Sequence, residues 1–91
     1  MKISTLINYA GGFKEAVAEI KDLEQAGLDV VWVPEAYSFD APSAMGYLAA
    51  QTQRVTIASG ILPIYSRTPS LLAMTAAGID YLSDGRAMLG L

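Results

Sequence analysis

The side chain with the clearest capacity for chemistry is Glu35, which directly follows the apolar run Val30–Val33. A carboxylate at the end of a buried strand lies in a medium of low dielectric constant, which raises its pKa toward general acid–base use. The alternatives are a solvated loop glutamate and an ion-pair partner for Arg67. Tyr37 lies two positions after Glu35, and its phenol either hydrogen-bonds a ligand or covers the core.

A second candidate segment spans residues 59–69 and includes Gly60, Ile61 and Tyr65. A glycine at the end of a strand, followed by an apolar run without turn residues, indicates a bulge or a close approach of the backbone to a flat ligand. The alternative is a plain strand end followed by a long loop. Tyr65 has the same two alternatives as Tyr37.

The composition argues against several other kinds of site. The sequence contains neither cysteine nor histidine, so a metal site would have to consist of carboxylates alone, and we expect none. The net charge is −3, and the six lysines and arginines are scattered singly. Because a nucleic-acid-binding surface needs clustered basic residues, we also expect no nucleic-acid partner.

The sequence predicts no membrane partner. Lys2 leads directly into a predicted strand, without the apolar region of a signal peptide. The longest weakly polar stretch, residues 71–82, is too short to cross a bilayer. We therefore expect a cytoplasmic protein.

The elements that position the candidate residues alternate along the chain. Apolar runs predict strands, and helical spacing predicts helices between them. This alternation is typical of right-handed βαβ units in a parallel sheet. The predicted strands are residues 3–8, 30–33, 55–61 and 87–91, and the predicted helices are residues 13–26, 41–52 and 70–82.

A parallel sheet needs both faces covered and its edges closed or protected, and four strands with three helices do this poorly. We therefore expect an α/β protein of the (β/α)8 TIM-barrel type, present as an N-terminal half barrel in a single incomplete domain spanning residues 1–91. In such barrels the active site lies in the loops after the strands, which selects the segments around Asn8, Glu35 and Gly60.

Local signals mark the ends of the predicted helices. Gly27 suits the position after the first helix, and Pro34 closes the second strand because it lacks a backbone N–H group. Asp40 is a predicted N-cap of the second helix. Thr68 and Pro69 form a predicted cap and first position of the third helix.

The second and third predicted helices carry almost no charge. Residues 41–53 contain none, and residues 69–81 contain only Asp80. Charged residues make up 16% of the chain, against roughly 25% in an average globular domain. A helix that is apolar all round is normally buried on more than one face. These helices either pack against their neighbours and the sheet, or form a subunit interface.

Several segments together resemble the bacterial luciferase-like flavin or deazaflavin oxidoreductases, above all the branch that uses coenzyme F-420. The sequence Leu-Ser-Asp-Gly-Arg before a strand ending in Leu-Gly-Leu is specific in that setting. The resemblance covers the whole chain and implies a (β/α)8 barrel of which more than half is absent. The segments are residues 26–33, 35–37, 59–63, 65–69, 82–86 and 89–91.

The resemblance also implies a cofactor site. Its members have a non-prolyl cis peptide at the end of the third strand, behind the central ring of the cofactor, and this position is Gly60–Ile61 here. The loop after the second strand contributes an acid and then a histidine, but Ala36 follows Glu35 here, which argues against sugar-phosphate dehydrogenase activity. Glu35 is the predicted catalytic residue. The predicted cofactor-binding residues are Asn8, Glu35, Ala36, Ser59, Gly60 and Ile61.

The implied activity is hydride transfer between a small-molecule substrate and coenzyme F-420, or monooxygenation with FMN as the alternative cofactor. The resemblance further implies a homodimer through the second and third helices. Because the phosphate tail of the cofactor normally needs loops after later strands, we expect the 91 residues alone to be inactive. The alternative function is a non-catalytic half barrel that self-associates and needs the missing half for activity.

Overall fold

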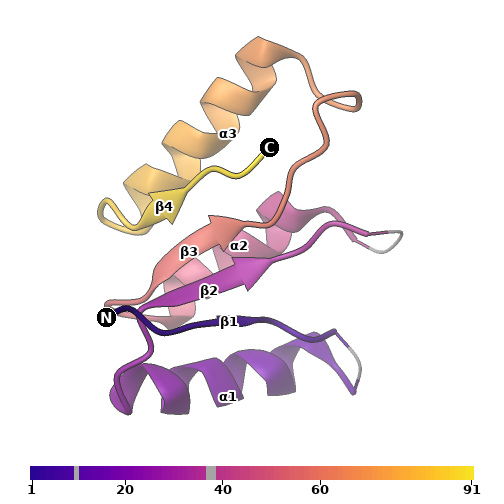
Figure 1. Cartoon of the computed structure of the whole chain (residues 1–91). Coiled ribbons are helices and arrows are strands. Elements are labelled where there is room, and N and C mark those ends of the chain that lie inside the picture. Colours follow the sequence, from indigo (N-terminus) through magenta and orange to yellow (C-terminus); the bar gives the residue numbers. More distant parts are fainter. Residues whose placement is uncertain (10, 37–38) are drawn as a thin grey trace.

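The computed structural model describes residues 1–9, 11–36 and 39–91, and within them strands and helices alternate as predicted (Figure 1). Strand β2 has the predicted bounds, and each helix differs from prediction by one residue at one of its two ends. The elements are β1 (Ser4–Leu6), α1 (Phe13–Gln25), β2 (Val30–Val33), α2 (Ala41–Gln51), β3 (Thr56–Ser59), α3 (Pro69–Leu82) and β4 (Ala87–Met88).

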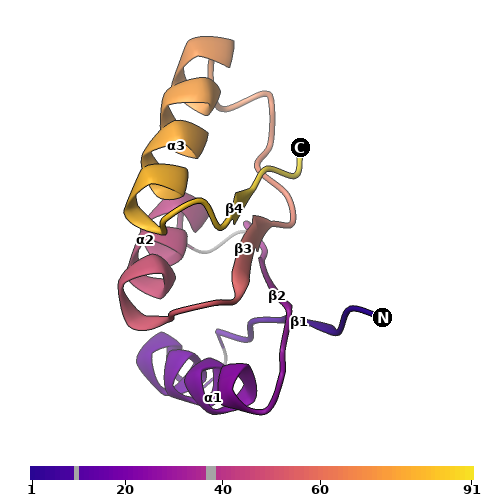
Figure 2. The ribbon, with the colours of Figure 1, turned by 90° about the vertical axis from the view of Figure 1, so that its left-hand side faces the viewer.

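The four strands form one parallel sheet in the order β1-β2-β3-β4. Neighbours in the sheet are therefore also neighbours in sequence, and each pair is joined by a helix. Figure 2 shows all three helices on the same side of the sheet. A sheet wound in one direction, with its helices on one face, is the repeating arrangement of a (β/α)8 barrel, so the predicted fold class is confirmed.

The strand register divides the sheet into two faces. Val31 pairs with Ile57, and both are fully buried on the side of the helices. The next row of partners runs across all four strands and points to the other side, because successive side chains of a strand alternate between faces. This row, called the open-face row below, consists of Leu6, Trp32, Ala58 and Met88.

No described element covers the open face of the sheet (Figure 2). Leu6 is consequently 61% exposed and Met88 43% exposed, although both are large apolar residues in strands. The hydrophobic core lies on the other side, between the sheet and the helices. Its most deeply buried large side chains include Val17, Val31, Leu48, Val55, Ile57 and Leu62.

The predicted roles of Asp40, Thr68 and Gly27 at the helix ends are confirmed. The carboxylate of Asp40 accepts a hydrogen bond from the Ser43 N–H at 3.0 Å, and the hydroxyl of Thr68 accepts one from the Leu71 N–H at 3.2 Å. These bonds satisfy donors that a helix start otherwise leaves without partners. Gly27 has a φ of 111°, a conformation that favours glycine after a helix.

Three strands are shorter than predicted. β1 can pair only with the short strand β2, and its ladder is limited to three residue pairs. The ladder of β3 and β4 ends at the pair Ala58–Met88. Beyond that pair, Gly90 bonds to the side chain of Ser59 and to the backbone of Leu62 in place of a regular ladder.

Glu24 holds α1 against the turn between α2 and β3. Although it is only 6% exposed, its carboxylate accepts hydrogen bonds from the N–H groups of Gln53, Arg54 and Val55, at 2.6–3.1 Å. Burial acts to raise the pKa of Glu24, but these bonds outweigh it and hold the pKa below its ordinary value. The local sequence around Glu24 does not indicate this role, because the partners of Glu24 lie about thirty residues away in the chain.

Replacing Glu24 with glutamine should lower the free energy of unfolding by about 2–3 kcal/mol at pH 7, because hydrogen bonds to a buried charge are lost. Since the folded pKa is depressed, this contribution is present above the unfolded pKa, near 4.5, and disappears as pH falls through the folded pKa. Urea unfolding at pH 7, and again at a pH below the folded pKa, measures this contribution. Glu19→Gln, at an exposed position of α1, is the control, and equal losses in both variants would contradict the prediction.

Candidate functional site

The predicted site residues lie at one edge of the sheet, because the carboxyl ends of parallel strands meet there. Asn8 follows β1, Glu35 and Ala36 follow β2, and Ser59 is the last residue of β3. Asn8 and Ala36 are exposed, and Glu35 is partly buried. The topology thus brings the predicted residues of all three loops to the edge where barrel enzymes carry their active sites.

The segment Gly60–Ile61 continues this edge beyond β3. Its peptide bond is cis, as the resemblance implied. The Gly60 N–H donates to the carbonyl oxygen of Val33 at 2.9 Å, and a Cβ on Gly60 would lie 3.2 Å from Cε3 of Trp32. The backbone therefore passes close to an open-face ring, and Ile61, 51% exposed, adds apolar surface beside it. Gly60, Ile61 and the ring of Trp32 together form an apolar surface, which is called the apolar wall below.

Ser59 is fully buried. Its hydroxyl donates to the carbonyl oxygen of Gly90 at 2.9 Å and accepts from the Gly90 N–H at 2.8 Å. The side chain of this predicted cofactor-binding residue is thus hydrogen-bonded to Gly90, which lies two residues after the end of β4. Gly90 itself was not predicted as a site residue, although it lies in the Leu-Gly-Leu signature.

Glu35 forms a two-pronged ion pair with Arg67, with both N–O distances at 2.7 Å. Its carboxylate also accepts the N–H of Ala41, the first residue of α2, at 2.7 Å. The hydrogen bonds from Arg67 hold the pKa of Glu35 below its ordinary value, outweighing partial burial. The predicted rise in pKa is therefore wrong, and the alternative of an ion pair with Arg67 is confirmed. Glu35 is an anion at neutral pH.

The tyrosines after the strands have different surroundings. Tyr65 is 97% exposed, so it does not cover the core. Tyr37 lies outside the described residues. The Tyr9 hydroxyl donates to the carbonyl oxygen of Pro34 at 3.3 Å. Burial, and then the nearby charges of Glu35 and Asp40, raise the pKa of Tyr9. Tyr9 is thus a neutral phenol facing an acidic edge.

An aromatic cavity of about 430 Å³ lies where α1 and α2 begin. The ring of Tyr9 stacks on Phe13 with centroids 5.4 Å apart, and Phe13 meets Tyr47 at 5.9 Å. From the sequence, Phe13 was expected only as the first residue of the helix at residues 13–26. Aromatic residues near the starts of consecutive helices were the available signal. The cavity is lined by Tyr9, Phe13, Lys14, Phe39, Asp40, Ser43, Ala44 and Tyr47.

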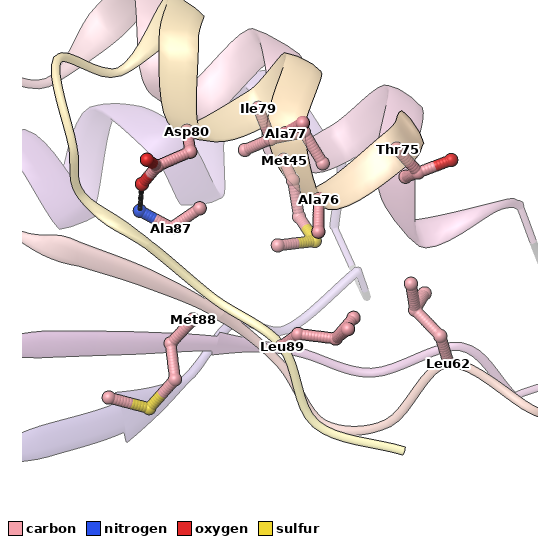
Figure 3. A pocket seen from close by; sticks show the side chains of 10 residues that line it. All are labelled: Met45, Leu62, Thr75, Ala76, Ala77, Ile79, Asp80, Ala87, Met88 and Leu89. Atoms are coloured by element: carbon pink, nitrogen blue, oxygen red, sulfur yellow. Dashed lines mark hydrogen bonds between the residues drawn. The ribbon is translucent and has the colours of Figure 1, made fainter. Parts of the chain in front are cut away.

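A second cavity, of about 330 Å³, lies between α3 and β4 (Figure 3). Its lining is mainly apolar, and its one carboxylate, that of Asp80, accepts the N–H of Ala87 at 3.2 Å. None of the six predicted site residues lines it, so this cavity does not belong to the predicted site. The lining residues are Met45, Leu62, Thr75, Ala76, Ala77, Ile79, Asp80, Ala87, Met88 and Leu89.

The part of the chain that the structure describes contains neither a metal-binding cluster nor a membrane-spanning helix. Residues 1–9, 11–36 and 39–91 contain no group of three or more acidic, histidine or cysteine residues placed to hold a metal ion. Within the same residues, none of the helices combines the length and the apolar character needed to cross a bilayer.

Known proteins are similar to this chain in sequence. A protein of Mycobacterium tuberculosis that carries the name of a coenzyme F-420-dependent oxidoreductase is 35% identical over 96 residues, covering 100% of this chain and 27% of its own length. The 5,10-methylenetetrahydromethanopterin reductase of Methanolobus tindarius is 33% identical over 69 residues, covering 75% of this chain and 21% of its own length. The chain thus spans about a quarter of the length of these relatives.

Solved structures share the fold. The coenzyme F-420-dependent tetrahydromethanopterin reductase of Methanopyrus kandleri matches 99% of this chain and 26% of its own, with a TM-score of 0.84 and 25% identity. The oxygenating constituent of 3,6-diketocamphane monooxygenase from Pseudomonas putida, in complex with FMN, matches 99% of this chain and 29% of its own, with a TM-score of 0.84 and 17% identity. The sequence also matches the luciferase-like monooxygenase family over residues 1–91. This chain therefore belongs to the luciferase-like monooxygenase family.

Proposed function

We propose that this chain supplies one wall of the cofactor site in a luciferase-like oxidoreductase that acts on a small molecule. Coenzyme F-420 is the proposed cofactor, since two of the relatives above carry it in their names. FMN is the alternative, and the FMN complex with the same fold supports it. The proposal concerns a whole barrel, of which this chain would form the N-terminal part.

The apolar wall at the end of β3 is the observation that carries the proposal. Gly60 has no side chain to keep a flat ring away, and Ile61 and the ring of Trp32 border it. These groups fit the face of a flavin or deazaflavin better than a sugar or phosphate. When bound, coenzyme F-420 accepts or donates a hydride, whereas reduced FMN supports oxygenation. The chain's part is to orient the ring and exclude water from one side of it.

The polar residues of the edge have complementary proposed roles. Glu35 stands at the redox end of the ring as an anion, held by Arg67. Ala36, in the position where the resemblance has a histidine, cannot move a proton. We therefore propose that Glu35 orients groups near the ring and that proton transfer uses residues elsewhere. Asn8 would border the ring from the side of β1.

The runner-up function is a non-catalytic half barrel that self-associates. It is favoured by the large apolar side chains that α3 leaves exposed and by the open face of the sheet. Both functions allow an interface through α2 and α3, which we propose as the route to a homo-oligomer. On α3, Met74 is 71% exposed and Tyr81 83% exposed. Such a surface normally has a partner.

The 91-residue chain should sediment as a dimer or larger species at micromolar concentration. Met74→Glu should shift this equilibrium toward monomer, because it places a charge in the proposed apolar interface. Ala18→Glu, at an exposed position of α1, should leave it unchanged. A parent chain that sediments as a monomer and unfolds cooperatively would rule out the interface.

A completed barrel, in which this chain replaces the matching segment of the Methanopyrus kandleri reductase, tests the proposed function. We expect it to bind reduced coenzyme F-420 or FMN saturably, and the 91 residues alone to show no turnover. Gly60→Val should abolish binding with little loss of secondary structure, because its side chain would press on Trp32 and occupy the wall. Gly78→Val, in open space on α3, is the control. Unchanged affinity in Gly60→Val would refute the wall.

The ion pair with Arg67 predicts a lowered pKa for Glu35. A carbon-13 NMR titration of its side-chain carboxyl should give a pKa below the ordinary value of 4.5, and Arg67→Met should raise it, because both charged hydrogen bonds disappear. The pair's contribution to stability is then lost as pH falls through the depressed pKa. Arg54→Met, away from Glu35, is the control. Equal pKa values in the parent chain and Arg67→Met would show that the ion pair does not form in solution.

A further inference from the structure

Strands β3 and β4 remain joined after their regular ladder ends. Three hydrogen bonds converge on one residue, Gly90. The Ser59 hydroxyl donates to its carbonyl oxygen at 2.9 Å, and its N–H donates to the Ser59 hydroxyl oxygen at 2.8 Å. The Leu62 N–H donates to the same carbonyl oxygen at 2.9 Å. A side-chain hydroxyl thus takes the place that backbone groups hold in a regular ladder.

Gly90 has to be a glycine for this arrangement. A Cβ built on it would lie 2.2 Å from the carbonyl oxygen of Ser59 and 3.6 Å from Cγ2 of Ile61. The first distance is far below any van der Waals contact, and the atom that it meets is backbone. Any larger residue would therefore push the two chain segments apart.

These contacts bracket the proposed wall. Ser59 precedes Gly60–Ile61 and Leu62 follows it, and both bond to Gly90. On the side of β2, the Gly60 N–H bonds to the carbonyl oxygen of Val33. Ser59 and Leu62 are fully or almost fully buried, whereas Ile61 is half exposed. Gly60–Ile61, the part of the wall that follows β3, is thus a short segment held by buried residues on either side.

We propose that Ser59 and Gly90 form a latch that sets the position of Gly60–Ile61, and that Ser59 is a positioning residue for cofactor binding. Its hydroxyl acts through Gly90 and does not itself contact the cofactor. This inference rests on the proposed function for its consequence, while the latch itself is a property of the chain. It changes the predicted role of Ser59 from a contact to a support.

Amide hydrogen exchange in the 91-residue chain tests the latch. Ser59→Ala should speed exchange of the Gly90 and Leu62 N–H groups by about tenfold or more, because loss of the hydroxyl opens the junction locally. Ser83→Ala is a matched control. Ser83 is also fully buried, and its hydroxyl also makes two bonds, to Arg86 N–H and the Asp80 carbonyl, but before β4. Unchanged exchange at Gly90 and Leu62 in Ser59→Ala would overturn the latch.

Cofactor affinity in the completed barrel tests the positioning role. Ser59→Ala and Gly90→Ala should each weaken binding of reduced coenzyme F-420 or FMN by about tenfold or more, and Ser59→Thr, which keeps the hydroxyl, should bind more tightly than Ser59→Ala. Ser83→Ala should bind the cofactor like the parent barrel, even when Ser83→Ala and Ser59→Ala unfold at similar urea concentrations. Equal weakening by Ser83→Ala would overturn the positioning role.

The two tests separate this inference from the proposed function. If the parent barrel binds neither cofactor, the proposed function fails, and the exchange experiment still decides whether Ser59 and Gly90 hold the segment. If the barrel binds and Ser59→Ala loses exchange protection without losing affinity, the latch stands as a structural feature and the positioning role is refuted.

Discussion

Parallel, in-register pairing of four short strands is the constraint on which the remaining structure depends. Because each strand is joined to the next by a helix on the same side, one face of the sheet is buried and the other is left open (Figure 2). The register then fixes which side chains meet on that open face. It places Trp32 between Leu6 and Ala58 and close to Gly60, the residue that follows β3. The apolar wall follows from this placement.

Side chains add to the backbone hydrogen bonds that hold the two ends of the sheet. At the amino ends of the strands, the Glu24 carboxylate gathers three backbone N–H groups of the turn before β3. At the carboxyl ends, Glu35 joins the start of α2 to Arg67 in the loop before α3. Ser59 joins β3 to the residues after β4. The buried and partly buried polar groups are paired in each case, which is the condition for placing them there at low cost.

The element order, the helix caps and the edge of the sheet that holds the site could be predicted because they depend on local patterns. Periodicity predicted α1, and the residue types at positions 40 and 68 predicted two helix starts. Burial alone suggested a raised pKa for Glu35, since the sequence does not show that Arg67 reaches it with two hydrogen bonds. Glu24 and Gly90 were missed for the same reason: their partners lie about thirty residues away in sequence.

The fluorescence of Trp32, the one tryptophan of this sequence, reports directly on whether a cofactor ring binds against the apolar wall. Coenzyme F-420 or FMN is titrated into the completed barrel and its Trp32→Phe variant, and the difference in tryptophan emission is followed beside the cofactor's own signal. A ring seated on the wall should change the Trp32 emission saturably, at the same concentrations at which the cofactor signal changes. Binding of the cofactor without any change in Trp32 emission would show that its ring does not bind against the apolar wall.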